Sequence, residues 1–291
     1  MKVALTGSTG FLGVHLIHHL IKNGHQVIAI KRDTSSLEEF ELVCSFYKED
    51  PSFYHKLQWL DIELYDTASL AEAFQSCRAV VHTAGLISYS LKDRQALRYV
   101  NQELTESVVN AALSTSVEHF VLISSTGALQ NRNEHGFITE ELNWDSGLDH
   151  TYYGYTKYLG EKEVYRASEE GLSFSILNPG VILGYGDWTK GSLKLFKNAF
   201  RSFPFYSKGV TGFIGVEDLC RITIERLSKG PNGKRICCIN SNHSFKEIAE
   251  LMARSFDVKG PRIEVRGWLY QLILALMMYP KVETLFPVLN N

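Results

Sequence analysis

Two tyrosine–lysine pairs stand in one short stretch, TYYGYTKYLGEK, from Thr151 to Lys162. Tyr153 precedes Lys157 by four residues, and Tyr158 precedes Lys162 by four. On a helix, residues four apart share a face, so either pair could place an ammonium beside a phenol. A neighbouring cation favours the phenolate and lowers the pKa of the phenol from its ordinary value of about 10, as acid–base chemistry at neutral pH requires. The pairs are offset by about 140° around the axis, so at most one faces a given pocket.

Position within the helix favours one pair, although the spacing alone also suits an ordinary half-exposed helix face. Tyr153 lies at the start of the expected helix, near the carboxyl ends of the strands, where open α/β sheets bind their ligands. Tyr158 is more than one turn further from that edge. The sequence therefore predicts Tyr153 with Lys157 as the chemical pair.

A glycine-rich turn forms a second candidate site. The strand-like segment KVALT runs directly into GSTGFLG, which spaces Gly7, Gly10 and Gly13 three residues apart where a first strand would give way to a first helix. Glycines allow the backbone to turn tightly and approach phosphates, while the free N–H groups of the helix start face the negative charge. This pattern predicts a dinucleotide pyrophosphate site.

Two basic residues, Lys31 and Arg32, follow the second strand-like segment, QVIAI. An acid at this place usually binds the ribose 2′-hydroxyl of NAD, whereas a basic residue accommodates the 2′-phosphate of NADP. The sequence therefore predicts that NADP(H) is preferred over NAD(H). Asp33 follows directly, and two solvated basic residues before a turn remain the alternative interpretation.

Taken together, TGSTGFLG near the N-terminus, SST at 124–126 and Tyr153-x-x-x-Lys157 resemble the extended (atypical) short-chain dehydrogenase/reductase family of the NAD-dependent epimerase/dehydratase superfamily. The nearest resemblance is to its dihydroflavonol-4-reductase-like members. The resemblance implies that Tyr153 is the catalytic acid and that Lys157 tunes it and holds the nicotinamide ribose. It also implies that Ser125 donates to the substrate oxygen and that Asn101 orders the lysine through water. Asn178-Pro179 departs from the Arg-Pro of many relatives.

The resemblance further implies the cofactor contacts, with Asp61 at the adenine and the backbone of residues 83–85 against the cofactor. His82, just before them, is interpreted as a core histidine. Gln130 falls where related reductases place a polar substrate-contacting side chain. The implied cofactor-binding residues are Thr6, Gly7, Thr9, Gly10, Phe11, Leu12, Gly13, Lys31, Arg32, Asp61, Ile62, Thr83, Ala84, Gly85, Tyr153, Lys157, Pro179 and Val181.

The elements that must position these residues alternate between short β-branched segments and longer amphipathic ones. This alternation predicts a doubly wound parallel α/β sheet of the Rossmann type, with a smaller C-terminal substrate lobe. Strands are expected at 2–6, 26–30, 57–61, 79–84, 119–124 and 173–177, and helices at 11–22, 67–76, 92–115 and 152–170. The Rossmann domain is expected to span 1–178 with 210–240 returning to it, and the substrate-binding lobe to span 179–209 and 241–291.

The lobe segment is rich in aromatic residues, which favours an apolar or aromatic substrate or, alternatively, forms the core of the lobe. The residues are Tyr185, Trp188, Phe196, Phe200, Phe203, Phe205 and Tyr206.

The amino-acid composition limits which partners the protein is expected to bind. The 291 residues carry 30 basic and 32 acidic side chains, and no long basic run is available to neutralise nucleic-acid phosphates. The five cysteines form no CxxC and no Cys/His cluster, so no metal is expected. The apolar segment from Gly267 to Pro280 is shorter than the ~20 residues of a membrane span, and the N-terminus has no signal-peptide pattern. We expect a cytoplasmic protein with a small carbonyl substrate, and a homodimer is left open.

Three functions remain in competition. The first is NADPH-dependent reduction of a ketone or aldehyde to an alcohol, with Tyr153 as proton donor. The second is a nucleotide-sugar epimerase or dehydratase on the same fold, which mostly retains NAD. The third is a non-catalytic NADP-binding sensor, which has no need of Ser125, Tyr153 and Lys157 together.

Overall fold

The computed structural model describes residues 1–129, 133, 135–141, 144 and 150–265. The chain divides into two compact units. The first comprises Met1–Gly186 and Ile214–Asn240, and the second comprises Asp187–Phe213 and Ser241–Asn291. Gln130, expected at the substrate, and the apolar segment 267–280 lie outside the described residues.

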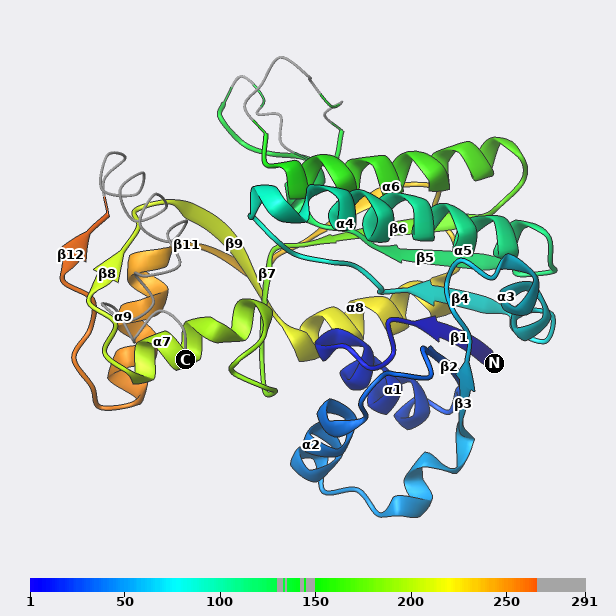
Figure 1. Cartoon of the computed structure of the whole chain (residues 1–291), viewed down its shortest axis with the longest axis horizontal. Coiled ribbons are helices and arrows are strands. Elements are labelled where there is room, and N and C mark those ends of the chain that lie inside the picture. The colour runs from blue at the N-terminus through cyan, green and yellow to red at the C-terminus, as the bar shows by residue number, and fades with distance from the viewer. Residues whose placement is uncertain (130–132, 134, 142–143, 145–149, 266–291) are drawn as a thin grey trace. The chain divides into compact units, whose positions relative to one another are not determined.

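A seven-stranded parallel sheet forms the centre of the first unit (Figure 1), in the order β10-β6-β5-β4-β1-β2-β3. This confirms the predicted doubly wound fold, because the strand order reverses next to β1, and β1 pairs in parallel with both β2 and β4. The strands are β1 Lys2–Thr6, β2 Gln26–Lys31, β3 Leu57–Asp61, β4 Ala79–His82, β5 His119–Ile123, β6 Phe174–Pro179 and β10 Arg235–Cys238.

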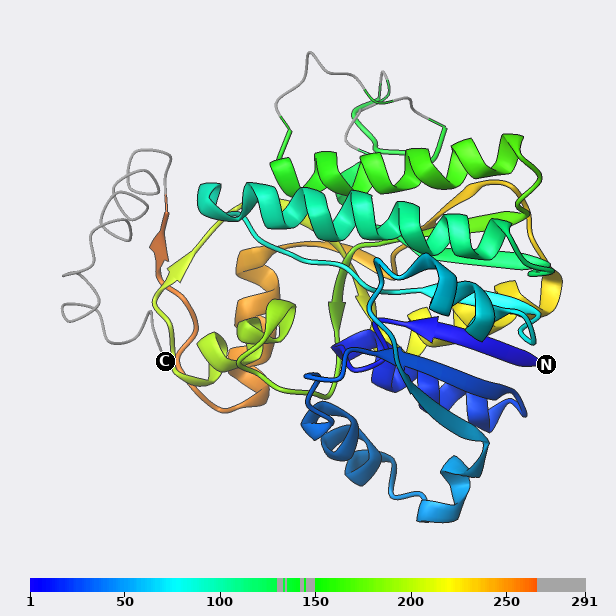
Figure 2. The ribbon, with the colours of Figure 1, turned by 45° about the vertical axis from the view of Figure 1, so that its right-hand side comes forward.

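Helices cover both faces of this sheet, as Figures 1 and 2 show. Alternate residues of each strand point to opposite faces, so Val3 and Leu5 join a core with α1 and α8, while Ala4 joins a second core with α3, α5 and α6. Near-continuous burial along β1, β2 and β4 is the mark of strands covered on both sides. The helices are α1 Phe11–Lys22, α2 Glu38–Tyr47, α3 Thr67–Phe74, α4 Arg94–Arg98, α5 Leu104–Leu113, α6 Tyr152–Glu169 and α8 Val216–Lys229.

The helix expected at 92–115 is interrupted. A 3₁₀ turn at Leu91–Asp93 and the short α4 lead into a π-helical turn at Tyr99–Glu103, after which α5 begins. Single π turns are frequent at functional sites, and this one carries Asn101. Helix α2 and the 3₁₀ segment Pro51–Lys56 between β2 and β3 were not among the expected elements. Strand β7, Val181–Leu183, follows β6.

The second unit has its own aromatic core. Trp188 contacts Phe196, Phe200 and Phe256, with ring centroids 5.4–6.2 Å apart. Much of the aromatic content of the expected lobe therefore packs on itself. Tyr185 lies instead in the first unit, stacked on Phe46 at 4.3 Å.

Short elements build the rest of this unit, and Ser244 caps its longest helix by a capping box with Glu247. The elements are the 3₁₀ turn Gly191–Leu193, α7 Lys194–Phe200, β8 Phe205–Tyr206, β9 Val210–Gly215, β11 Ser241–Ser244, α9 Phe245–Ser255 and β12 Ile263–Glu264. Strand β9 continues from the second unit into the first at Ile214. Within the described ranges, no helix is long and apolar enough to span a bilayer.

Candidate active site

The glycine turn between β1 and α1 is closely packed. Gly7 has a φ of +68°, and a Cβ there would lie 2.5 Å from the Ala84 nitrogen, while a Cβ at Gly13 would overlap the Gly7 carbonyl. The amide of Gly10 donates to the Gly7 oxygen over 3.1 Å. Gly10 is the N-cap of α1, and no side chain caps the helix there. Thr9 and Phe11 are partly exposed beside it. This cradle of bare backbone fits a dinucleotide pyrophosphate.

A chain of buried polar groups runs behind the strand ends. Thr6 Oγ1 lies 2.6 Å from His82 Nδ1, and His82 Nε2 lies 3.1 Å from Thr105 Oγ1. Because Thr105 donates its own proton to the Asn101 carbonyl over 2.9 Å, His82 donates from Nε2 and accepts at Nδ1 from Thr6. Burial lowers the pKa of His82 to about 3. His82 is thus a neutral, fully hydrogen-bonded core histidine.

Asn101 is buried in the π turn, and its amide joins three segments. It accepts from the Leu86 amide over 2.8 Å, and its nitrogen donates to the Leu86 carbonyl and to Thr156 Oγ1. A Cβ at Gly85 would lie 3.3 Å from Asn101 Oδ1 and 3.5 Å from Lys157 Nζ. The segment that follows β4 is therefore held beside Lys157. Thr83 donates to the Thr6 carbonyl over 2.8 Å, which joins this segment to the end of β1.

The structure brings Tyr153, Ser125 and Lys157 together at the carboxyl end of β5. Thr151 caps α6 by accepting from the Gly154 amide, which places Tyr153 in the first turn. Lys157 is buried, and its ammonium donates to the Ile123 carbonyl over 3.0 Å. Burial lowers the pKa of Lys157 to about 8, against the opposing effect of Glu161. Tyr158 stacks on Trp144 at 4.6 Å, apart from this group.

Burial opposes the expected effect of Lys157 on the pKa of Tyr153. Burial raises the pKa of Tyr153 to about 12, and the neighbouring Ser125 hydroxyl opposes the rise. Desolvation raises this pKa because it disfavours the charged phenolate, and the Lys157 ammonium donates to the Ile123 carbonyl. Tyr153 therefore holds its proton at neutral pH.

Sequence reasoning missed a buried network directly beneath these residues. Glu161 has no exposed surface and accepts from Ser124, from Asn178 Nδ2 over 2.6 Å and from Arg235 Nε over 2.7 Å. Asn178 Nδ2 also donates to the Ser125 carbonyl over 2.9 Å. We call these four residues, Ser124, Glu161, Asn178 and Arg235, the Glu161 network. The available signal was Glu161 four residues beyond Lys157, on the face shared with Tyr153.

The two basic residues after β2 differ in their surroundings. Lys31 forms an ion pair with Asp61, its register partner on β3. Arg32 is exposed, and its guanidinium makes no hydrogen bond or ion pair with the described residues. The Ile62 amide donates to the Lys31 carbonyl over 2.9 Å, extending the pairing of β2 with β3. The carboxylate of Asp61, predicted at the adenine, is thus directed to Lys31.

The remaining predicted contacts lie around the same strand ends. Leu12 is buried in α1, Pro179 ends β6 and Val181 begins β7, partly exposed. In the described segments, no group of three or more His, Cys, Asp or Glu residues could hold a metal ion.

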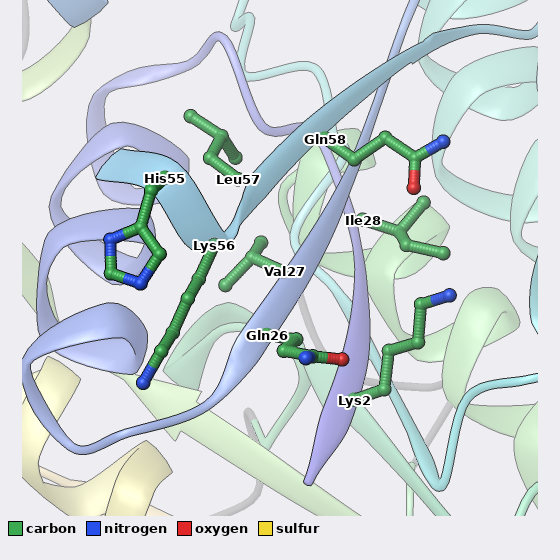
Figure 3. A pocket seen from close by; sticks show the side chains of 8 residues that line it. All are labelled: Lys2, Gln26, Val27, Ile28, His55, Lys56, Leu57 and Gln58. Carbon is green, nitrogen blue, oxygen red and sulfur yellow. The ribbon is translucent and has the colours of Figure 1, made fainter. Parts of the chain in front are cut away.

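An open cavity of about 360 Å³ lies elsewhere, and Figure 3 shows the side chains that line it. Lys2, Gln26 and Leu57 are the first residues of β1, β2 and β3, so this cavity lies at the amino ends of the strands. It is therefore at the edge opposite the glycine turn, and it is separate from the candidate site.

Comparisons with known proteins agree with this geometry. Residues 3–234 match the NAD dependent epimerase/dehydratase family. The chain is 25% identical over 292 residues to sterol demethylase protein B of Methylococcus capsulatus, covering 99% of this chain and 84% of that protein. It is 23% identical over 268 residues to dihydroflavonol 4-reductase of Gerbera hybrida, and the match covers 86% of this chain and 71% of that protein.

Among solved structures, a mutant of UDP-glucuronic acid 4-epimerase from Bacillus cereus, in complex with NAD, has a TM-score of 0.77 at 19% identity. The match covers 91% of this chain and 86% of that one, and it shows the same fold. The chain therefore belongs to the NAD dependent epimerase/dehydratase family, and it is an NAD(P)-dependent enzyme of the extended short-chain dehydrogenase/reductase type.

Proposed function

We propose that this enzyme reduces a ketone or aldehyde to an alcohol with NADPH, and that Tyr153 is the proton donor. The observation that carries the proposal is the convergence of Ser125, Tyr153 and Lys157 at the carboxyl end of β5. A Cβ at Gly127 would lie 3.3 Å from Ser125 Oγ and 3.7 Å from Tyr153 Cε1, and the buried Lys157 ammonium donates to the Ile123 carbonyl. A protonated phenol is an acid, so it suits the reductive direction, in which negative charge develops on the carbonyl oxygen.

When bound, NADPH would supply the hydride for the carbonyl carbon. Ser125 donates a hydrogen bond to the carbonyl oxygen, and Tyr153 transfers its proton to that oxygen. Lys157 then stabilises the phenolate that remains, because its ammonium lies one helical turn along the same face. Asn101 positions the residue 85–86 backbone beside Lys157, and the glycine turn and the start of α1 hold the pyrophosphate.

Preference for NADPH is part of the proposal, supported by Lys31 and Arg32 at the end of β2. A charge-assisted contact to a phosphate contributes ~1.5 to 3 kcal/mol, so NADPH should bind ~10- to 150-fold more tightly than NADH. An apolar carbonyl substrate is also proposed. It is supported by the similarity to a dihydroflavonol 4-reductase.

The test compares Tyr153→Phe with Tyr158→Phe, its matched control on the same helix. Tyr153→Phe should keep its NADPH affinity, measured by calorimetry, and should lose ~10² to 10⁴ in turnover on a panel of apolar aldehydes and ketones. Tyr158→Phe should change turnover little, because Tyr158 packs on Trp144. The reverse result would mean that the wrong pair has been chosen.

A nucleotide-sugar epimerase is the second candidate, since the similar Bacillus cereus structure is of an epimerase with NAD. Ion pairing of Lys31 with Asp61 also favours it, because it leaves fewer free cations for a 2′-phosphate. Identification of the cofactor that copurifies with the protein separates the two. An epimerase would retain NAD and show no net NADPH consumption, whereas the reductase would consume NADPH with a carbonyl substrate.

A further inference from the structure

The ends of β2 and β3 carry two opposite charges that are fixed to each other. Lys31 and Asp61 are register partners in the parallel pair, and their side chains form an ion pair. The side chain of Lys31 is only 13% exposed, whereas that of Asp61 is 54% exposed. The ammonium of Lys31 is therefore held against the sheet edge by a carboxylate that itself faces solvent.

Arg32, the next residue, is in a different situation. It lies just beyond the end of β2 and is exposed. Its carbonyl accepts from the Ser35 amide, but its guanidinium forms no hydrogen bond or ion pair with the part of the chain that the structure describes. Asp33 follows it and is also exposed. Lys31, Arg32, Asp33 and Asp61 together carry no net charge, so the electrostatic balance at this edge depends on which of them are paired.

The carboxyl ends of β2 and β3 lie next to the glycine turn. The buried hydroxyl of Ser8, inside the turn, donates to the Ile30 carbonyl near the end of β2 over 2.6 Å. The Lys31–Asp61 pair therefore lies next to the backbone cradle at which the proposed function places the dinucleotide.

We propose that Asp61 sets the cofactor preference of this enzyme by neutralising Lys31, which leaves Arg32 as the cation that discriminates in favour of a 2′-phosphate. This inference rests on the proposed function for the location of the dinucleotide, and it changes the assignment made there, in which Lys31 and Arg32 act alike. Lys31 and Asp61 act as one neutral unit, so removal of either member exposes the charge of the other to the cofactor.

Lys31→Ala leaves Asp61 as a free carboxylate, which repels a 2′-phosphate and favours a ribose hydroxyl, so the NADPH-over-NADH ratio of affinities should fall about fivefold. Asp61→Asn frees Lys31, so the ratio should rise about fivefold. The double variant Lys31→Ala/Asp61→Asn carries neither charge, and its ratio should return to within about twofold of the unaltered protein. Arg32→Ala should lower the ratio the most, by at least tenfold.

The experiment is a set of dissociation constants for NADPH and NADH, measured by calorimetry on the full-length protein at low and at moderate salt. 2′,5′-ADP and ADP serve as fragment probes that isolate the 2′-phosphate. The control is Arg78→Ala/Glu118→Gln, which removes an exposed ion pair at the opposite edge of the sheet; it should leave all four constants unchanged. Thermal unfolding checks that each variant is folded.

The NADPH-over-NADH ratio of the double variant Lys31→Ala/Asp61→Asn is the decisive measurement. If its ratio stays as low as that of Lys31→Ala, Lys31 contacts the phosphate by itself and the proposal is overturned. An Asp61→Asn protein with an unchanged ratio would overturn it equally. Failure of the unaltered protein to bind either dinucleotide would instead refute the location of the cofactor site, which separates failure of the proposed function from failure of this inference.

Discussion

Two polar networks lie on opposite faces of the central sheet, and they differ in how fully their buried side chains are hydrogen-bonded. The Glu161 network, on the α6 face, contains the ion pair of Arg235 and Glu161. The side chain of Arg235 is 10% exposed, and that of Glu161 is fully buried. Three donors form hydrogen bonds with the carboxylate of Glu161. Within the described chain, the side-chain oxygen of Asn178 is its one buried polar atom without a partner.

The second network, the α1 histidine cluster, consists of His15, His18, His19, Tyr47 and Glu217. His15 lies 2.6 Å from the Tyr47 hydroxyl and 2.8 Å from the Tyr185 carbonyl, and Tyr47 also donates to Glu217 over 2.6 Å. His18 differs from them. Its ring stacks on Tyr47 at 3.6 Å, and neither of its buried nitrogens has a partner in the described structure.

This difference in hydrogen bonding follows from whether the buried side chains are charged. A buried ion pair must have its hydrogen bonds satisfied, because an uncompensated charge in a dry site costs several kcal/mol. A histidine can instead remain neutral: burial, with the neighbouring His19 and Lys22, lowers the pKa of His18 to about 4. The network beneath Ser125 is thus built to hold a fixed geometry, while the α1 histidine cluster tolerates a cost in stability.

The largest expected effect comes from breaking the ion pair. Glu161→Gln leaves Arg235 without its counter-charge and should lower the free energy of unfolding by about 3 to 5 kcal/mol, measured by urea denaturation. Glu170→Gln is the control, because Glu170 pairs with Arg166 on the exposed side of the same helix and its loss should cost less than about 1 kcal/mol. Equal costs at the two sites would show that burial of the pair is unimportant.

The second largest expected effect is on the pH dependence of stability, through His18. The pKa of His18 is about 4 in the folded protein and has its ordinary value of 6.5 in the unfolded chain, so between these values the unfolded chain binds the additional proton. Stability is therefore lost as pH falls from about 6.5 towards 4. The stability advantage of His18→Phe over the unaltered protein should grow by about 2 kcal/mol between pH 7.5 and pH 4.5. A constant difference across this range would refute a neutral His18.

The smallest effect concerns His18 at neutral pH. His18→Phe keeps the stack on Tyr47 and removes two unpartnered nitrogens, so it should raise the free energy of unfolding by about 1 kcal/mol. His15→Phe is the matched control on the same helix, and it should destabilise the protein because it abolishes contacts to Tyr47 and Tyr185. Thermal unfolding at pH 7.5 measures both. A destabilised His18→Phe would mean that the site cannot accommodate the larger ring.

Much of the fold was predictable because it depends on local pattern. The strands at 2–6 and 57–61 and the helix at 11–22 were predicted with the observed bounds, since apolar periodicity and glycine positions mark them directly. Helix α2 was missed, and it has no side-chain N-cap. The break at Tyr99–Glu103 was also missed, because a π turn has no strong sequence signature and depends on the packing of Asn101 against residues 85–86.

The sequence by itself determined the glycine turn, the choice of Tyr153 over Tyr158 as candidate acid, and the alternation that yields a doubly wound sheet. Each depends on residues within a helical turn or on the order of elements. Only the tertiary structure decided that Asp61 is paired with Lys31, that Arg235 neutralises Glu161 from 74 residues away, and that burial raises the pKa of Tyr153. The physical reason is that strand register and burial fix which distant charges meet and how much water surrounds them, and neither quantity is encoded in local spacing.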